Sequence, residues 1–111
     1  MEQEELLSSL EQELRRGTIV LGVLSRLDKP MYGYNLVEVL ADNGLRVDAN
    51  TLYPLLRRLE SQGLLTSSWD TDSTKPRKYY ERTKDGTSVY KELKKQWNEI
   101  STGMETLLSG K

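Results

Sequence analysis

The sequence predicts a mainly α-helical chain with a single β-hairpin between its third and fourth helices. Apolar residues recur at helical spacing in four segments, whereas residues 77–83 form an extended, basic and tyrosine-rich run. The third segment is the most informative, because its leucines share one side of a helix and its polar residues share the other. The apolar side holds Leu52, Leu55, Leu56 and Leu59, and the opposite side holds Asn50, Pro54, Arg57 and Ser61. A helix that presents a polar face and leads into a basic hairpin is typical of a winged helix-turn-helix with a two-stranded β wing.

The first helical segment carries a leucine stripe in an acidic context. Its leucines are Leu6, Leu7, Leu10 and Leu14. Residues 15–18 interrupt the stripe, and residues 19–27 resume it. Two interpretations follow: either Gly17 bends one long helix, or Thr18 caps a second one. The segment ends at Asp28-Lys29-Pro30, because proline breaks the helical hydrogen-bond pattern.

A second helix is expected to begin around Tyr32-Gly33-Tyr34 and to end at Asn43-Gly44, where glycine suits a left-handed cap. Its inward residues are Leu36, Val37, Val39 and Leu40. Arg46-Val47 is then expected to pair as a short strand. Asp48 is a suitable N-cap for the third helix. Pro54 lies beyond the first turn of that helix, which predicts a late start or a local irregularity.

The wing carries a local excess of positive charge in a chain that is nearly neutral overall. Gly63 ends the third helix, and the extended runs 64–69 and 77–83 flank the polar loop 70–76. The net charge is -1, but residues 73–84 carry five basic side chains and one glutamate. Tyr79 and Tyr80 are neighbours on a strand, so they are expected to point to opposite faces. This basic patch predicts salt-sensitive binding to nucleic acid.

The last helix is expected to run from Thr83 or Lys84 to about Leu108. Apolar and aromatic residues form a heptad-like seam at Tyr90, Leu93, Trp97, Ile100, Met104 and Leu107. Such a helix must fold back on its own domain or pack on another copy of the chain. We favour another copy because the predicted core is small, and we expect Leu10 and Leu14 of the first helix to join that dimer interface.

Composition limits the classes of function. The 111 residues include no cysteine and no histidine, which excludes disulfides, thiolate metal sites and Cys- or His-based catalysis. We therefore expect no enzyme activity, no cofactor and no metal. The longest apolar run, residues 19–24, is too short to span a bilayer, and the acidic N-terminus does not resemble a signal peptide. A cytoplasmic protein without membrane contact is expected.

Eight residues are candidates for contacts with double-stranded DNA: Tyr32, Asn50, Thr51, Tyr53, Arg57, Lys75, Arg77 and Lys78. Arg57 lies most directly opposite the apolar stripe, so it is the best candidate for bidentate recognition of guanine. Tyr32 is favoured over Tyr34 as a phosphate contact, with Tyr34 assigned to packing. Asp70 and Asp72 oppose deep insertion of the hairpin, so Lys75 and Arg77 are expected to contact the DNA backbone.

Five motifs resemble the PadR family of bacterial transcriptional regulators across about residues 15 to 100. They are Arg16-Gly-Thr-Ile, Pro30-Met-Tyr-Gly-Tyr, Thr51-Leu-Tyr-Pro-Leu-Leu-Arg-Arg-Leu-Glu, Gln62-Gly-Leu-Leu and Arg77-Lys-Tyr-Tyr-Glu-Arg-Thr-Lys-Asp-Gly. The resemblance implies a dimeric repressor of the short form, with one C-terminal helix, on a palindromic operator. We expect one domain, residues 1–111, with a DNA-binding winged helix at 15–83 and a dimerisation helix at 84–108.

The resemblance also implies an effector site, because some PadR-like regulators stack flat aromatic drugs between paired tryptophans of their C-terminal helices. Trp97 matches that position, and Leu93 and Ile100 would line a pocket for a small aromatic or hydrophobic effector. The alternative is that Trp97 only packs in the dimer interface. For the whole chain, the rival function is a winged-helix module that binds protein and not DNA, which the acidic N-terminus and near-neutral charge favour.

Overall fold

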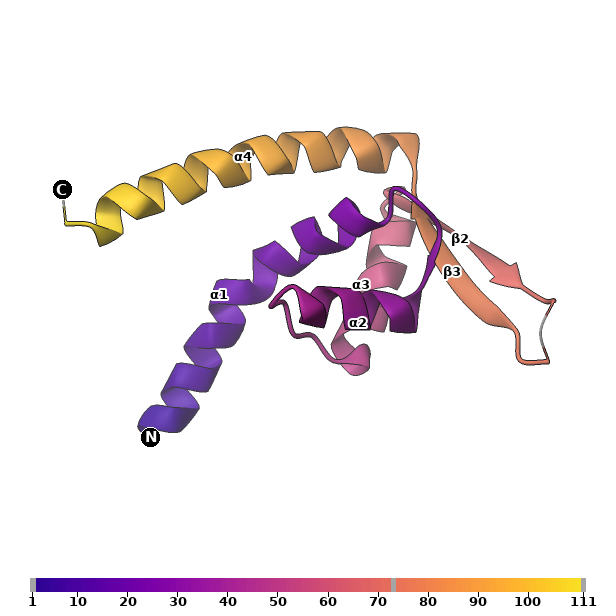
Figure 1. The fold of residues 1–111 in the computed structure, drawn as a ribbon, viewed down its shortest axis with the longest axis horizontal. Helices are drawn as coiled ribbons and strands as arrows, with labels where there is room; N and C mark the ends of the chain where they lie inside the picture. The colour runs from indigo at the N-terminus through magenta and orange to yellow at the C-terminus, as the bar shows by residue number, and fades with distance from the viewer. Residues whose placement is uncertain (1, 73, 111) are drawn as a thin grey trace.

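Two long helices diverge from a small hub in the computed structural model, which describes residues 2–72 and 74–110 (Figure 1). The elements in chain order are α1 (Gln3–Arg26), β1 (Met31–Tyr32), α2 (Gly33–Asp42), α3 (Ala49–Ser61), β2 (Leu65–Asp70), β3 (Arg77–Arg82) and α4 (Lys84–Leu108). The molecule measures 55 × 35 × 24 Å. The predicted mainly helical winged fold is confirmed. The free ends of α1 and α4 both lie on the side opposite the wing.

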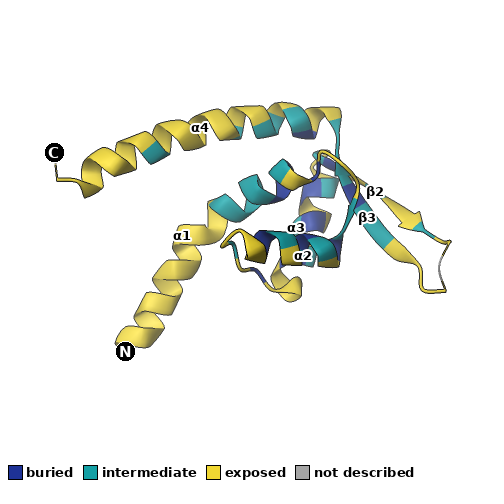
Figure 2. Cartoon of the chain, viewed as in Figure 1, coloured by how far each residue is buried: buried dark blue, intermediate teal, exposed yellow. Residues whose placement is uncertain are grey.

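The core lies in the hub, where α2, α3, the sheet and the C-terminal part of α1 meet (Figure 2). Its buried apolar side chains are Val23, Leu24, Leu27, Leu36, Leu40, Val47, Leu52, Leu56, Leu59, Leu65 and Tyr80. Leu52 and Leu56 are fully buried, as their stripe on the third helix predicts. Each such leucine contributes about 1.5–3 kcal/mol when it is removed from water. The hub is therefore the part of the chain that can fold on its own contacts.

The first helix is continuous, which decides between the two sequence interpretations in favour of one long helix. Thr18 does not cap a second helix, because its hydroxyl donates to the carbonyl of Arg15 at 2.7 Å within α1. The helix changes direction about halfway along its length (Figure 1). A hydroxyl bonded back to the preceding turn, next to a glycine, favours such a bend. Every described residue before Thr18 is exposed, and burial begins beyond it.

Helices α2 and α3 form the helix-turn-helix, and two expectations about residues 46–54 are wrong. Arg46 and Val47 form no strand; Val47 is instead buried in the core. Helix α3 begins at Ala49 and continues through Pro54. Proline removes one hydrogen bond to the Asn50 carbonyl, but Asn50 is exposed and water can satisfy that group. Two expected caps are present, since Asp48 accepts from the Thr51 amide at 2.8 Å and Gly44 adopts φ +85°.

The sheet has three antiparallel strands in the order β1-β3-β2, and β1 takes the place of the strand expected at residues 46–47. Met31 and Tyr32 pair with Tyr80 and Tyr79 of β3. Two residues directly before a helix carry no strand periodicity, so the sequence gives no signal for β1. Tyr80 is buried and Tyr79 is half-buried beside Tyr32, which confirms that the two rings take opposite faces.

Helix α4 begins where predicted. The Thr83 hydroxyl accepts from the Gly86 amide at 2.9 Å, and the helix then runs to Leu108. Gly86 is required at its position, because a Cβ there would collide with the carbonyl oxygen of Leu64. The first turns of α4 lie against the hub, and the rest of the helix extends away from it (Figure 2). Among the described residues, no helix is long and apolar enough to cross a membrane.

Candidate nucleic-acid interface

Helix α3 presents a polar surface because its leucines fix which side is buried. Asn50, Thr51, Arg57 and Ser61 are exposed, and Arg57 extends from the side opposite Leu52 and Leu56. The Asp48 cap holds the first turn of the helix, so its amide groups and the Thr51 hydroxyl lie at the exposed end. Exposed amide, hydroxyl and guanidinium groups on one helix face can contact both phosphates and base edges.

Tyr53 does not lie on this presented face, contrary to the sequence prediction. Its ring covers Gly33 of α2, where an added Cβ would clash with the phenol. The side chain is half-buried between the two helices. Tyr53 therefore sets the approach of α2 to α3, and only glycine fits at residue 33.

The hydroxyl of Tyr32 is engaged inside the protein. It donates a hydrogen bond to the Oδ2 atom of Asp70, at the end of β2. The ring of Tyr32 also makes an edge-to-face contact with Tyr79, and the Arg77 guanidinium lies 5.3 Å from its centroid. The hydrogen bond raises the pKa of Tyr32 and lowers the pKa of Asp70. We call this the Tyr32–Asp70 clasp; it ties the distal part of the wing to the start of α2.

A second polar link joins the wing to the end of α3. The Ser67 hydroxyl donates to Glu60 at 2.5 Å, and the Lys78 ammonium lies 3.6 Å from the other oxygen of Glu60. Lys78 also lies over the rings of Trp69 and Tyr80, at 6.0 and 5.4 Å. Glu60 was not among the sequence candidates. Helical spacing places Glu60 near Arg57 and gives no sign that Glu60 contacts the wing. The contact of Glu60 with Ser67 depends on the strand register, which places Ser67 opposite Tyr80.

Arg82 is half-buried, and its guanidinium contacts α1 and α4. Its guanidinium donates to the Leu24 carbonyl at 2.8 Å and to the Thr87 hydroxyl at 3.0 Å, and it lies 4.6 Å from the Tyr90 centroid. The positive charge of the segment 73–84 is therefore not all presented outward. Lys75 and Arg77 are the predicted wing contacts that remain exposed, at the end of the loop that leads into β3.

The predicted dimer seam divides into two parts. Tyr90 and Leu93 are half-buried against the hub of their own chain. The rest of the seam is exposed: Trp97 at 43%, Ile100 at 57%, Met104 at 42% and Leu107 at 72%. Leu10 and Leu14 of α1 are exposed as well. The described chain thus leaves two apolar helical stripes without cover.

Comparison with known proteins agrees with this geometry. A model of the transcriptional regulator PadR-like family matches residues 20–95. A transcriptional regulator of Mycobacterium tuberculosis is 32% identical over 91 residues, which cover 81% of this chain and 85% of the relative. A solved PadR family transcriptional regulator from Eggerthella lenta is 53% identical, has a TM-score of 0.87, and matches 97% of this chain and 96% of its own. A PadR-like regulator from Bacillus cereus is 27% identical, with a TM-score of 0.77 over 89% of this chain and 99% of its own.

Proposed function

Because the chain belongs to the PadR-like family of transcriptional regulators, we propose that it is a homodimeric repressor that occupies a palindromic operator. The observation that carries this proposal is the exposed polar face of α3, together with the exposed Lys75 and Arg77 of the wing. Asn50, Thr51 and Arg57 would enter the major groove, and Lys75 and Arg77 would contact the neighbouring backbone. In this proposal residues 1–111 act as one domain, with α4 as its dimerisation helix.

The wing contributes less charge to this interface than its sequence suggests. Lys78 is paired with Glu60 and Tyr32 with Asp70, so both act on DNA mainly by fixing the position of the wing. Arg57 is the specificity residue of the proposal because its guanidinium has no partner among the described residues. Bidentate contacts of this kind discriminate between bases by about 1–3 kcal/mol.

The uncovered stripes of α1 and α4 support dimerisation through these two helices. A palindromic operator requires two recognition helices about 34 Å apart, one turn of DNA. The separation of the two α3 helices would then depend on how the α1 and α4 stripes of the two subunits pack. An effector bound between the subunits, beside Leu93, Trp97 and Ile100, would release the operator by changing that separation.

Salt titration tests DNA binding directly. Binding of a mixed-sequence duplex, followed by fluorescence anisotropy, should show a steep linear fall of log affinity with log salt concentration. The rival, a winged-helix module that binds protein, predicts little affinity for duplex and no such slope. A selected operator should then bind at least ~1000-fold more tightly than mixed sequence.

The effector site is tested by fluorescence. A planar aromatic cation should quench Trp97, and Trp97→Ala should abolish that quenching while the dimer persists. Trp69, which lies on the wing and is 61% exposed, reports any nonspecific quenching. Ligand affinity should fall when operator is present, because coupling between two sites is reciprocal. Dissociation of the Trp97→Ala dimer without any detectable quenching of the wild type would assign the indole to packing alone.

A further inference from the structure

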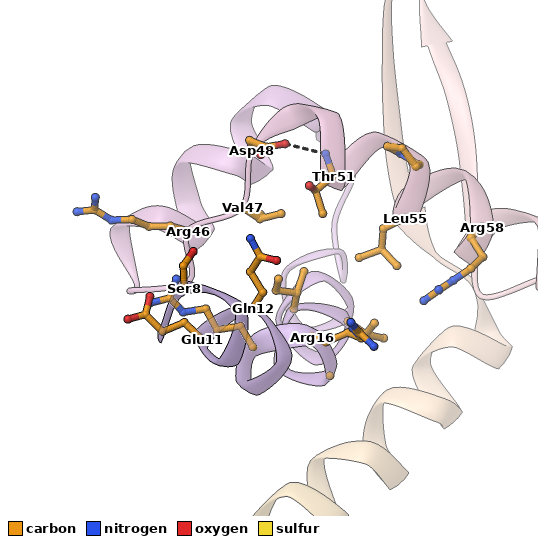
Figure 3. Close-up of a pocket in the computed structure, with 15 residues that line it drawn as sticks. Ser8, Glu11, Gln12, Arg16, Arg46, Val47, Asp48, Thr51, Leu55 and Arg58 are labelled. Atoms are coloured by element: carbon orange, nitrogen blue, oxygen red, sulfur yellow. Dashed lines mark hydrogen bonds between the residues drawn. The ribbon is translucent and has the colours of Figure 1, made fainter. Parts of the chain in front are cut away.

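A cleft of about 940 Å³ separates the polar side of α1 from the edge of α3 (Figure 3). Its lining combines apolar and basic side chains. The apolar side chains are Ile19, Val20, Val47 and Leu55. Four arginines contribute to the lining: Arg15, Arg16, Arg46 and Arg58. No DNA contact was expected from any of these four residues.

The cleft uses a different side of α1 from the leucine stripe. Ser8, Gln12 and Arg15 line the cleft and recur at helical spacing on one side of α1. Leu10 and Leu14 lie roughly opposite them, at the positions proposed for the dimer interface. Packing of a second subunit on the leucine stripe therefore leaves the basic side of α1 open.

The four arginines are exposed and outnumber the acidic residues of the cleft. Within residues 2–72 and 74–110, none of them forms an ion pair or a side-chain hydrogen bond. Two carboxylates, Glu11 and Asp48, share the lining, and Asp48 already accepts the Thr51 amide. Arginines gathered in this way create a positive potential that favours an anionic partner.

The cleft opens beside the presented face of α3, on the side away from the wing. Thr51, Pro54 and Arg58 line it, whereas Glu60, which contacts the wing, lies on the other side of the helix. A helix in the major groove, a space about 12 Å wide, has one phosphate backbone on each side. With α3 in the groove, the wing would lie next to one of these backbones and the cleft next to the other.

We propose that the arginines of the α1–α3 cleft bind backbone phosphates of the DNA strand that passes the recognition helix on the side opposite the wing. This inference rests on the proposed DNA binding and adds a second phosphate-binding surface, on α1. It predicts that α1 has two roles on two sides: leucines for the partner subunit and arginines for DNA. The contacts are to phosphate, so they add affinity for every sequence and no base preference.

The test compares the wild-type chain with Arg15→Ala/Arg16→Ala, in binding to a mixed-sequence duplex over a range of salt concentrations. The salt slope should fall by about two, roughly 0.9 per lost phosphate contact, and the affinity near 0.1 M salt should fall tenfold or more. Arg15→Lys/Arg16→Lys keeps both charges and should retain most of the slope. Arg26→Ala is the matched control, because Arg26 is an exposed arginine of α1 outside the cleft.

Each outcome decides the question. An alanine variant with the wild-type slope and affinity would overturn the inference while leaving DNA binding by α3 and the wing in place. If it keeps DNA binding but loses thermal stabilisation by inorganic pyrophosphate, the cleft holds a small anion and not DNA. If the wild-type chain binds no duplex, the proposed function fails first. Both arginines are exposed, so the variant should unfold at the wild-type temperature.

Discussion

The hub differs from the two helical arms that project from it, residues 3–17 of α1 and 94–108 of α4. All of them contain helices with an apolar stripe, but only in the hub is the stripe buried within the chain. Leu52 of α3 is fully buried, whereas Leu14 of α1 is 77% exposed and Leu107 of α4 is 72% exposed. Periodicity therefore identifies the side of a helix that will be buried and not the molecule that will bury it. Exposed leucines gathered along two helices are typical of an interface with another polypeptide.

The largest expected effect falls on the hub. Leu52→Ala removes a fully buried side chain, and it should lower the free energy of unfolding by about 2–5 kcal/mol. The loss should be seen in urea denaturation. Leu14→Ala is the matched variant in the arm. Its effect on the free energy of unfolding should depend on protein concentration, because Leu14 acts through dimerisation. Equal, concentration-independent losses for both variants would contradict the distinction between hub and arm.

The arm should instead respond to a charge placed in its seam. Ile100→Glu would put a carboxylate into the proposed dimer interface and weaken dimerisation by about 3 kcal/mol, roughly a hundredfold in the dimer dissociation constant. Sedimentation equilibrium measures the change. Thr102→Glu adds the same charge on the opposite side of α4, so it should leave the dimer intact. A soluble dimer of unchanged affinity for Ile100→Glu would assign the seam to some other contact.

Arginines show the same contrast between covered and uncovered side chains. Arg82→Ala removes three contacts inside the hub, so it should cost about 1–3 kcal/mol of folding stability. Arg57→Ala should leave stability within about 0.5 kcal/mol of wild type and cost about 1–3 kcal/mol in binding to operator. Lys75→Ala should weaken all sequences alike and reduce the salt slope by roughly one. If Arg57→Ala behaves like Lys75→Ala, then Arg57 contacts phosphate only.

The smallest effect is expected at the Tyr32–Asp70 clasp. Tyr32→Phe and Asp70→Asn should each change DNA affinity only a few-fold, and the double variant should do no more than either alone, since both break one contact. A phosphate contact by Tyr32 would make Tyr32→Phe harmful and Asp70→Asn beneficial, with additive effects. Anisotropy titrations of the three variants separate the two roles.

The hydrogen bond of the Tyr32–Asp70 clasp should not depend on pH near neutrality. Asp70 has a lowered pKa, so its contribution is present above the unfolded pKa of about 4 and is lost as the pH falls through the lower folded value. Tyr32 has a raised pKa, so its contribution is present below about pH 10 and is lost above the folded value. Wing-dependent DNA binding should therefore not change through this contact between about pH 5 and pH 9, as titrations at several pH values would show.

Most of the fold could be predicted from local patterns. Helical spacing located the four helices, and Asp48, Gly44, Gly63 and Thr83 marked where they begin or end. Strand β1 could not be predicted, because a two-residue strand has no period and exists only through pairing with β3. Pro54 neither delays nor ends α3: the helix loses one hydrogen bond there, and the buried Leu52, Leu56 and Leu59 hold it against the core.

The site was harder to predict than the fold because the direction of a side chain depends on distant neighbours. The helical pattern placed Tyr53 on the presented face of α3, and Tyr32 was predicted to contact phosphate through its hydroxyl. In the structure Tyr53 packs over Gly33 of α2, and Tyr32 donates to Asp70 at the end of β2. Arg82 was counted with the wing charge, although the carbonyl of Leu24 accepts its hydrogen bond across 58 positions of the chain. Spacing on one helix cannot reveal such contacts.

The position of Arg82 has a mechanical consequence. The residue joins the last turn of α1 to the first turn of α4, and its own amide also donates to the Leu27 carbonyl at 2.7 Å. The two arms thus share a single fulcrum next to the core. Helix α1 has 24 residues and is about 36 Å long, so a rotation of only about 5° at the fulcrum displaces its far end by about 3 Å. A displacement of a few Å at the tip of an arm would therefore need only a small change of angle where the two helices join.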